Sequence, residues 1–81
     1  MAGFAKSEAE IADRVSRYLK AELKRADVTY ETLAEKLSKH GVKGETVDSI
    51  KAKLKRGTFS AVFLLATLAA LEAEGVRLED I

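Results

Sequence analysis

Five basic side chains lie close together between residues 43 and 56 of this 81-residue sequence, and they are its clearest chemical feature. Only two acidic residues, Glu45 and Asp48, stand among them, so this segment is positive although the whole chain carries a formal net charge of +1. Residues 58–81 have the opposite balance, with one arginine against four acidic residues. Cations gathered on one surface can bind phosphate groups. The alternative is an ordinary solvated helix whose lysines only confer solubility.

The remaining polar residues offer little for catalysis or metal binding. The single histidine, His40, precedes a glycine, and we expect it to interact with a helix C-terminus, because a stable zinc site needs several ligands. Neighbouring carboxylates such as Glu72 and Glu74 lack a partner base, and Ser49 and Ser60 have no histidine nearby in sequence. We therefore expect no enzyme, no metal and no cofactor.

The composition predicts an all-α protein with a single domain spanning residues 1–81. Alanine, leucine, lysine and glutamate favour helices, and no proline interrupts them. The absence of cysteine is typical of a reducing cytoplasm. We see no signal peptide, and the apolar run 61–71 is shorter than the about 20 residues that cross a bilayer. We expect a cytoplasmic protein that does not enter a membrane.

The first helix is expected from about Ser7 to Arg25. Ser7 and Glu10 have the spacing of a capping box, in which each side chain caps the other residue's backbone N–H. Apolar residues then recur at spacings of three and four, which is typical of an amphipathic helix. These residues are Ile11, Val15, Tyr18, Leu19 and Leu23. We expect the ring of Tyr18 to pack in the core, and we leave Tyr30 open between packing and phosphate contact.

Two further helices are expected between residues 29 and 57. The first begins near Thr29 and ends at His40-Gly41, with Val42 tucked under the turn. The second begins near Glu45 or Thr46 and ends at Gly57. This pair has the layout of a helix-turn-helix.

A fourth helix is expected over about residues 60–74, ended by Gly75. Ser60 is its expected cap, and Phe59 could pack on Phe63 or Leu64 as a hydrophobic staple. This helix is apolar nearly all round, so one side should face the core and another a second subunit. The expected subunit contacts are Val62, Leu65, Ala66 and Ala69. We expect the last residues, with Val76, Leu78 and Ile81, to fold back over the core.

On these residues, the sequence resembles the phage-repressor type of helix-turn-helix domain, over roughly residues 19–81. Leu33-Ala34 matches the leucine-alanine pair of the first motif helix, and Ile50-x-x-x-Leu54-x-x-Gly57 is similar to the end of the recognition helix. Residues 59–81 resemble the closing helix and tail. The resemblance implies a compact four-helix, lambda-repressor-like domain with a C-terminal tail.

Three segments are closer still to a family of small uncharacterised bacterial proteins built on this plan. They are residues 19–25, 28–30 and 53–59. That resemblance implies a fold and no established function.

Two features depart from the repressor pattern. Gly41 follows Ala34 by seven positions, which is more than usual, and Glu45 and Asp48 lie where base contacts generally arise.

The resemblance implies a transcriptional regulator that binds double-stranded DNA as a homodimer, with the helix over residues 46–56 in the major groove. Thr46, Ser49 and Ala52 are then candidates for contact with base edges, and Arg56 could pair with guanine. The candidates for phosphate contact are Lys43, Lys51, Lys53, Lys55 and Arg56. The alternative is a protein-interaction or oligomerisation module on the same scaffold, without DNA binding.

Overall fold

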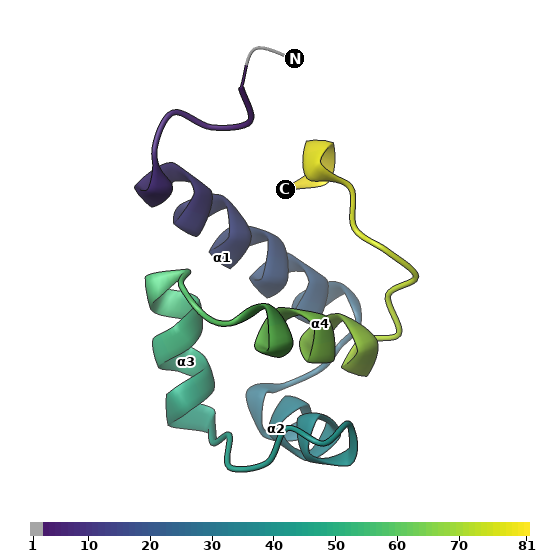
Figure 1. Ribbon diagram of the computed structural model, residues 1–81. Helices are drawn as coiled ribbons and strands as arrows, with labels where there is room; N and C mark the ends of the chain where they lie inside the picture. Colours follow the sequence, from purple (N-terminus) through teal and green to yellow (C-terminus); the bar gives the residue numbers. More distant parts are fainter. Residues whose placement is uncertain (1–2) are drawn as a thin grey trace.

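The computed structural model describes residues 3–81, and within this range all regular secondary structure is helical (Figure 1). The chain forms four α-helices followed by one short 3₁₀ helix. Their bounds are α1 Glu8–Arg25, α2 Tyr30–Lys39, α3 Val47–Arg56, α4 Ala61–Ala70 and η1 Leu78–Asp80. The expected all-α class is confirmed.

One hydrophobic core joins the four α-helices. Leu19, Leu33, Leu37, Ile50 and Leu54 are at most 1% exposed, and they come from α1, α2 and α3. A buried phenylalanine, Phe63, adds α4 to this cluster. Each such side chain contributes about 1.5–3 kcal/mol when removed from water. The core therefore fixes α2 and α3 relative to α1.

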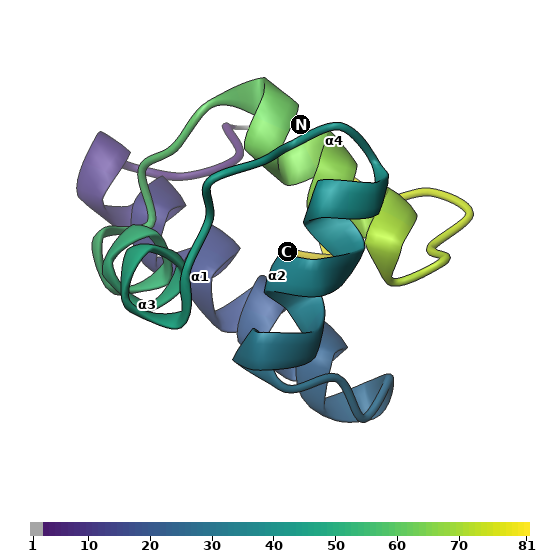
Figure 2. The same cartoon turned by 90° about the horizontal axis from the view of Figure 1, so that it is seen from below.

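The helices α2 and α3 cross steeply. In Figure 1 α3 is seen from the side, whereas in Figure 2, turned by 90°, it is viewed nearly along its axis beside α2. Residues 40–46 connect them, and the two helices pack against each other. This arrangement is that of two helices joined by a short connection, as expected from the sequence.

The start of α1 confirms only half of the expected capping box. The Ser7 side chain accepts a hydrogen bond from the Glu10 backbone N–H at 3.1 Å, as expected. The Glu10 carboxylate, however, accepts from the backbone N–H of Lys6 at 3.1 Å and not from that of Ser7. Both carboxylate and hydroxyl still satisfy backbone N–H groups near the helix start, where a negative charge is favourable.

Three helices end in the same way, with a residue at positive φ followed by an apolar residue. The positive-φ residues are Asp27 after α1, Gly41 after α2 and Glu72 after α4. In each case the next residue donates its N–H to a carbonyl five positions back: Val28 to Leu23, Val42 to Leu37 and Ala73 to Leu68. This is the Schellman motif, in which the apolar residue packs back on the helix.

The expected end of α4 at Gly75 is therefore wrong. The helix ends at Ala70, and Glu72, with φ of 57°, takes the left-handed conformation that a glycine commonly provides at a helix end. Leu68 and Ala73 provide the hydrogen bond and the apolar contact that close the helix there. That pairing outweighs the about 1–2 kcal/mol that a non-glycine residue loses in this conformation.

Gly57, by contrast, ends α3 as expected and has a second role. Its φ is 70°, and a Cβ atom at this position would overlap the backbone carbonyl group of Ala12 in α1. The glycine thus permits close contact between the end of α3 and α1. A second link between these helices is the buried Ser16 hydroxyl, which donates to the carbonyl oxygen of Leu54.

The C-terminal segment returns to α1, but its apolar residues do not cover the core as expected. Val76 and Leu78 are 40% and 59% exposed. The contact is made instead through the backbone of Ile81, which accepts hydrogen bonds from Arg14. The segment is thus held by a polar contact.

Candidate nucleic-acid interface

The first turn of α3 is fixed by a reciprocal capping box. The Thr46 side chain accepts from the backbone N–H of Ser49 at 3.1 Å, and the Ser49 hydroxyl oxygen accepts from the backbone N–H of Thr46 at 2.8 Å. Ser49 also donates to a carboxylate oxygen of Glu45 at 2.6 Å. Both hydroxyl groups expected to contact base edges therefore already stabilise the helix start.

The same network includes Lys53, one of the five basic residues between positions 43 and 56. The Lys53 ammonium lies 3.1 Å from each carboxylate oxygen of Glu45, and it stands 5.5 Å from the ring centre of Phe63. The side chains of Glu45 and Lys53 are only 12% and 26% exposed. Lys53 was expected to bind phosphate, but the structure places it against the core side of α3, where its charge is balanced.

The other cations of this segment are exposed. Lys51 and Lys55 lie on the outward side of α3, Arg56 at its C-terminal end and Lys43 on the α2–α3 connection. Within residues 3–81 none of these four takes part in an ion pair. Their charges therefore face solvent.

Two further residues share the outward side of α3. Asp48, which is exposed, lies in the first turn, where its charge is favourable toward the helix dipole. Ala52, which is half-buried, lies one turn further along and has only a methyl group, so the backbone can approach a surface closely. The face formed by Asp48, Lys51, Ala52, Lys55 and Arg56, called the α3 face below, is positive overall.

The residues expected at a subunit interface lie along one side of α4. Val62 and Leu65 are 66% and 65% exposed, Ala69 is exposed and Ala66 is half-buried. The expected staple is present, because the rings of Phe59 and Phe63 meet edge to face with centres 5.1 Å apart. The structure therefore gives α4 one side in the core and one apolar side that the fold leaves open.

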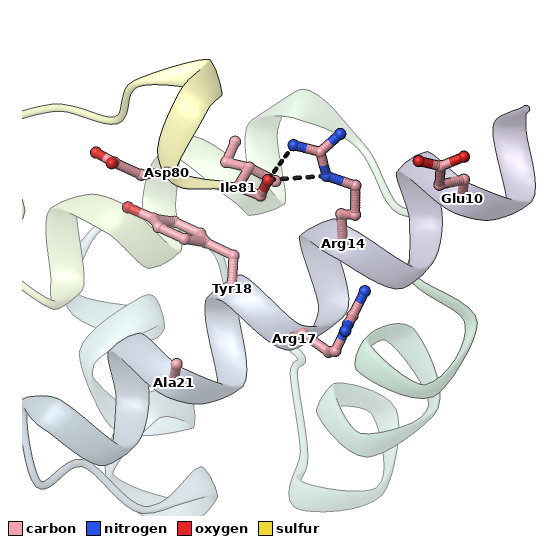
Figure 3. Close-up of a pocket in the computed structure, with 7 residues that line it drawn as sticks. All are labelled: Glu10, Arg14, Arg17, Tyr18, Ala21, Asp80 and Ile81. Atoms are coloured by element: carbon pink, nitrogen blue, oxygen red, sulfur yellow. Dashed lines mark hydrogen bonds between the residues drawn. The ribbon is translucent and has the colours of Figure 1, made fainter. Parts of the chain in front are cut away.

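Both tyrosines are half-buried and pack on the core cluster, so the packing expected for Tyr18 is confirmed and Tyr30 is placed with it. Burial raises the pKa of the Tyr18 hydroxyl above its ordinary value of 10.0, and the neighbouring Glu22 carboxylate raises it further. Tyr18 also lines a shallow hollow of about 440 Å³ with Arg14, Arg17 and Asp80 (Figure 3).

Arg14 is the polar residue of this hollow that sequence reasoning missed. Its Nε–H donates to the Ile81 carbonyl oxygen at 2.8 Å, and its terminal nitrogens donate to the carbonyl oxygens of Ile81 and Phe4 (Figure 3 shows the bonds to Ile81). The guanidinium carbon lies 4.2 Å from the centre of the Phe4 ring. Because these contacts hold both terminal segments on α1, Arg14 is structural. Its spacing of three from Ile11 and four from Tyr18 was the only signal in the sequence.

A comparison with protein families identifies the family of the chain. Residues 3–76 match the family described as a domain of unknown function, DUF6471, and the chain belongs to that family. Curated proteins and solved structures gave no significant match. In the described part of the chain, no helix has both the length and the apolar character needed to cross a membrane.

Proposed function

We propose that this protein binds double-stranded DNA through a helix-turn-helix of the phage-repressor type, formed by α2 and α3, with α3 in the major groove. The observation that carries the proposal is the row of exposed cations on and beside α3, namely Lys43, Lys51, Lys55 and Arg56. All but Lys43 lie on the second of two steeply crossing helices, which is the element that enters the groove in this class of protein.

Phosphate contact and base contact are assigned to different residues. Phosphate contact falls to Lys43, Lys51 and Lys55, because each is exposed and carries its charge without an ion-pair partner among residues 3–81. Lys53 leaves the set of phosphate candidates, since Glu45 balances its charge. Arg56 can contact either a phosphate or the O6 and N7 atoms of guanine.

Base contact falls to the outward side of α3. The methyl group of Ala52 can meet a thymine methyl, and the Asp48 carboxylate can accept from a cytosine amino group. The Thr46 side chain is exposed and remains able to donate its hydroxyl hydrogen, whereas Ser49 donates to Glu45. This assignment corresponds to a transcriptional regulator of the bacterial cytoplasm that acts as a dimer.

A second candidate function is that of a protein-interaction module without DNA binding. The observation in its favour is the open apolar side of α4, where Val62 and Leu65 are mostly exposed. On this alternative the α3 face only confers solubility or meets an acidic protein.

Selection from a random-sequence duplex library at near-physiological salt distinguishes the two functions. We expect enrichment of one site, and an inverted repeat with half-sites about one helical turn apart if two copies bind together. If the protein retained no duplex from the library, DNA binding would be contradicted. A variant with Lys51, Lys55 and Arg56 changed to glutamate should retain no duplex.

A further inference from the structure

The open side of α4 is a continuous apolar stripe. Val62, Leu65, Ala66 and Ala69 are spaced by three, four and seven residues, so they share one side of the helix. All ten residues of α4 are uncharged. In Figure 1, α4 runs along the near side of the molecule, and no other segment of residues 3–81 lies in front of it. Exposed apolar stripes of this kind mark interaction surfaces.

We propose that a second copy of this chain covers the stripe, with the two α4 helices antiparallel about a two-fold axis between Leu65 and Ala66. A two-fold interface brings residue i of one copy against residue j of the partner and j against i. With this axis, Val62 of each copy faces Ala69 of the other, and Leu65 faces Ala66. Each large side chain therefore meets a small one, which lets the helices interdigitate.

A parallel pair lacks this fit. Identical residues would then face each other, so Val62 and Leu65 would meet their own counterparts and Ala66 and Ala69 would face methyl groups only. Large residues would hold the helices apart at one end, and the alanines would leave a gap at the other. The order of large and small residues along α4 thus selects the antiparallel arrangement.

The charges that flank α4 select the same arrangement. After α4 the exposed residues Glu72 and Glu74 are acidic, and α4 begins with the positive end of its own helix dipole. An antiparallel pair places the acidic end of each copy beside the positive N-terminal end of the partner's helix, whereas a parallel pair places the two acidic ends together. Complementary charges across an interface fix orientation more than they add affinity.

These flanking residues are also needed for sufficient contact area. A helix of ten residues is about 15 Å long, and a stable interface buries roughly 800 Å² on each partner. The stripe forms the apolar centre, and the charged ends form the rim. The inference concerns association of the chain with itself, so it can be tested in the absence of DNA and does not depend on whether the protein binds DNA.

Sedimentation velocity over a micromolar concentration series tests the association. We expect a dimer for the natural sequence and, for Leu65→Glu, self-association weakened roughly 100-fold or more, since the change affects both copies. Leu78→Glu is the matched control, because Leu78 is 59% exposed and lies outside the stripe. Circular dichroism checks that each variant is folded. A natural sequence that stays monomeric at high micromolar concentration, or a Leu65→Glu variant that stays dimeric, would overturn the proposal.

Cysteine cross-linking tests the orientation, and the cysteine-free sequence suits it. Val62→Cys and Ala69→Cys are made separately and oxidised alone and mixed. In the antiparallel dimer position 62 faces position 69 of the partner, so only the mixture should form a disulfide-linked dimer. Positions 62 and 69 are about 10 Å apart along a helix, so in the antiparallel dimer the two copies of position 62 are at least that far from each other, too far for a disulfide. Cross-linking of Val62→Cys with itself would establish a parallel pair and contradict the inference.

Discussion

Two lysines two positions apart on α3 have opposite surroundings. Lys53 is held by the Glu45 carboxylate and the Phe63 ring, whereas Lys55 is exposed to solvent. The sequence alone does not separate them, because both belong to the same basic run. What separates them is the rotation of α3 that Ile50 and Leu54 impose when they enter the core.

Replacing each lysine by methionine should therefore give different results. Lys53→Met removes the ion pair and leaves Glu45 mostly buried, so we expect a loss of about 1–3 kcal/mol in the free energy of unfolding. Lys55→Met should change stability by less than about 0.5 kcal/mol but weaken DNA binding. Urea unfolding and a DNA-binding titration measure the two effects. Equal stability losses would contradict the assignment of Lys53 to the fold.

Gly57 and Gly41 offer a matched pair of glycines at positive φ. Gly57→Ala should destabilise the protein by more than about 2 kcal/mol, because strain at φ of 70° adds to overlap with the Ala12 carbonyl group. Gly41→Ala should cost only about 1 kcal/mol, since no described atom lies within 4 Å of a Cβ at that position. Urea unfolding of both variants measures the difference, and equal losses would argue against close contact between α3 and α1.

Tyr18 should make stability depend on alkaline pH. Its pKa is raised in the folded state, so as the pH rises the unfolded chain loses the Tyr18 proton first. The contribution of Tyr18 to the free energy of unfolding is therefore fully present below pH 10.0 and is lost as the pH rises through the folded-state pKa. Tyr18→Phe should lessen the fall in unfolding free energy between about pH 9 and about pH 11. Tyr30→Phe serves as the control for the loss of a hydroxyl. An unchanged slope for Tyr18→Phe would contradict the effect of burial.

At the scale of elements, the sequence predicted where all four α-helices begin, but it did not predict where α4 ends. Ser7, Thr29, Thr46 and Ser60 all cap helices at the expected places. Each is a residue whose side-chain oxygen accepts a backbone N–H, and few other residues do this. The end of α4 was missed because its signal is the Leu68–Ala73 contact and not a glycine.

The corrected end of α4 can be tested directly. Glu72→Gly should raise the free energy of unfolding by about 0.5–1 kcal/mol, because glycine adopts positive φ without strain. Gly75→Ala should change it by less than about 0.5 kcal/mol, since nothing in residues 3–81 lies within 4 Å of a Cβ at that position. Chemical denaturation compares the two variants. A larger effect at Gly75 would instead support the helix end expected from the sequence, at Gly75.

At the scale of the whole molecule, the sequence predicted the all-α fold, the order of the helices and the core side of α1. Their signals are local: apolar spacing, caps and glycine. The polar contacts that join distant segments had no such signal. Arg14 with Ile81, Ser16 with Leu54 and Glu45 with Lys53 depend on how the helices pack. The last of these pairs removes Lys53 from the candidates for phosphate contact.

The division of charge over the molecule agrees with the proposed function. The α3 face is positive, and the exposed residues after α4 are mainly negative. Phosphates would thus be attracted to one side of the molecule and repelled from another, which orients an approaching duplex. A basic patch alone also binds heparin and other polyanions, so the decisive quantity is the dependence of DNA affinity on the residues of this face.

The measurement that tests the central claim most directly is DNA affinity as a function of salt concentration. It compares the natural sequence, Lys51→Glu/Lys55→Glu/Arg56→Glu, and a control with the same charge change on exposed residues elsewhere, Lys6→Glu/Lys20→Glu/Lys24→Glu. If α3 enters the groove, the first variant should bind DNA much more weakly, with a salt slope that is lower by about 0.9 for each lost phosphate contact. The control should keep most of both. Equal losses in the two variants would show that only net charge matters and would contradict the proposed α3 interface.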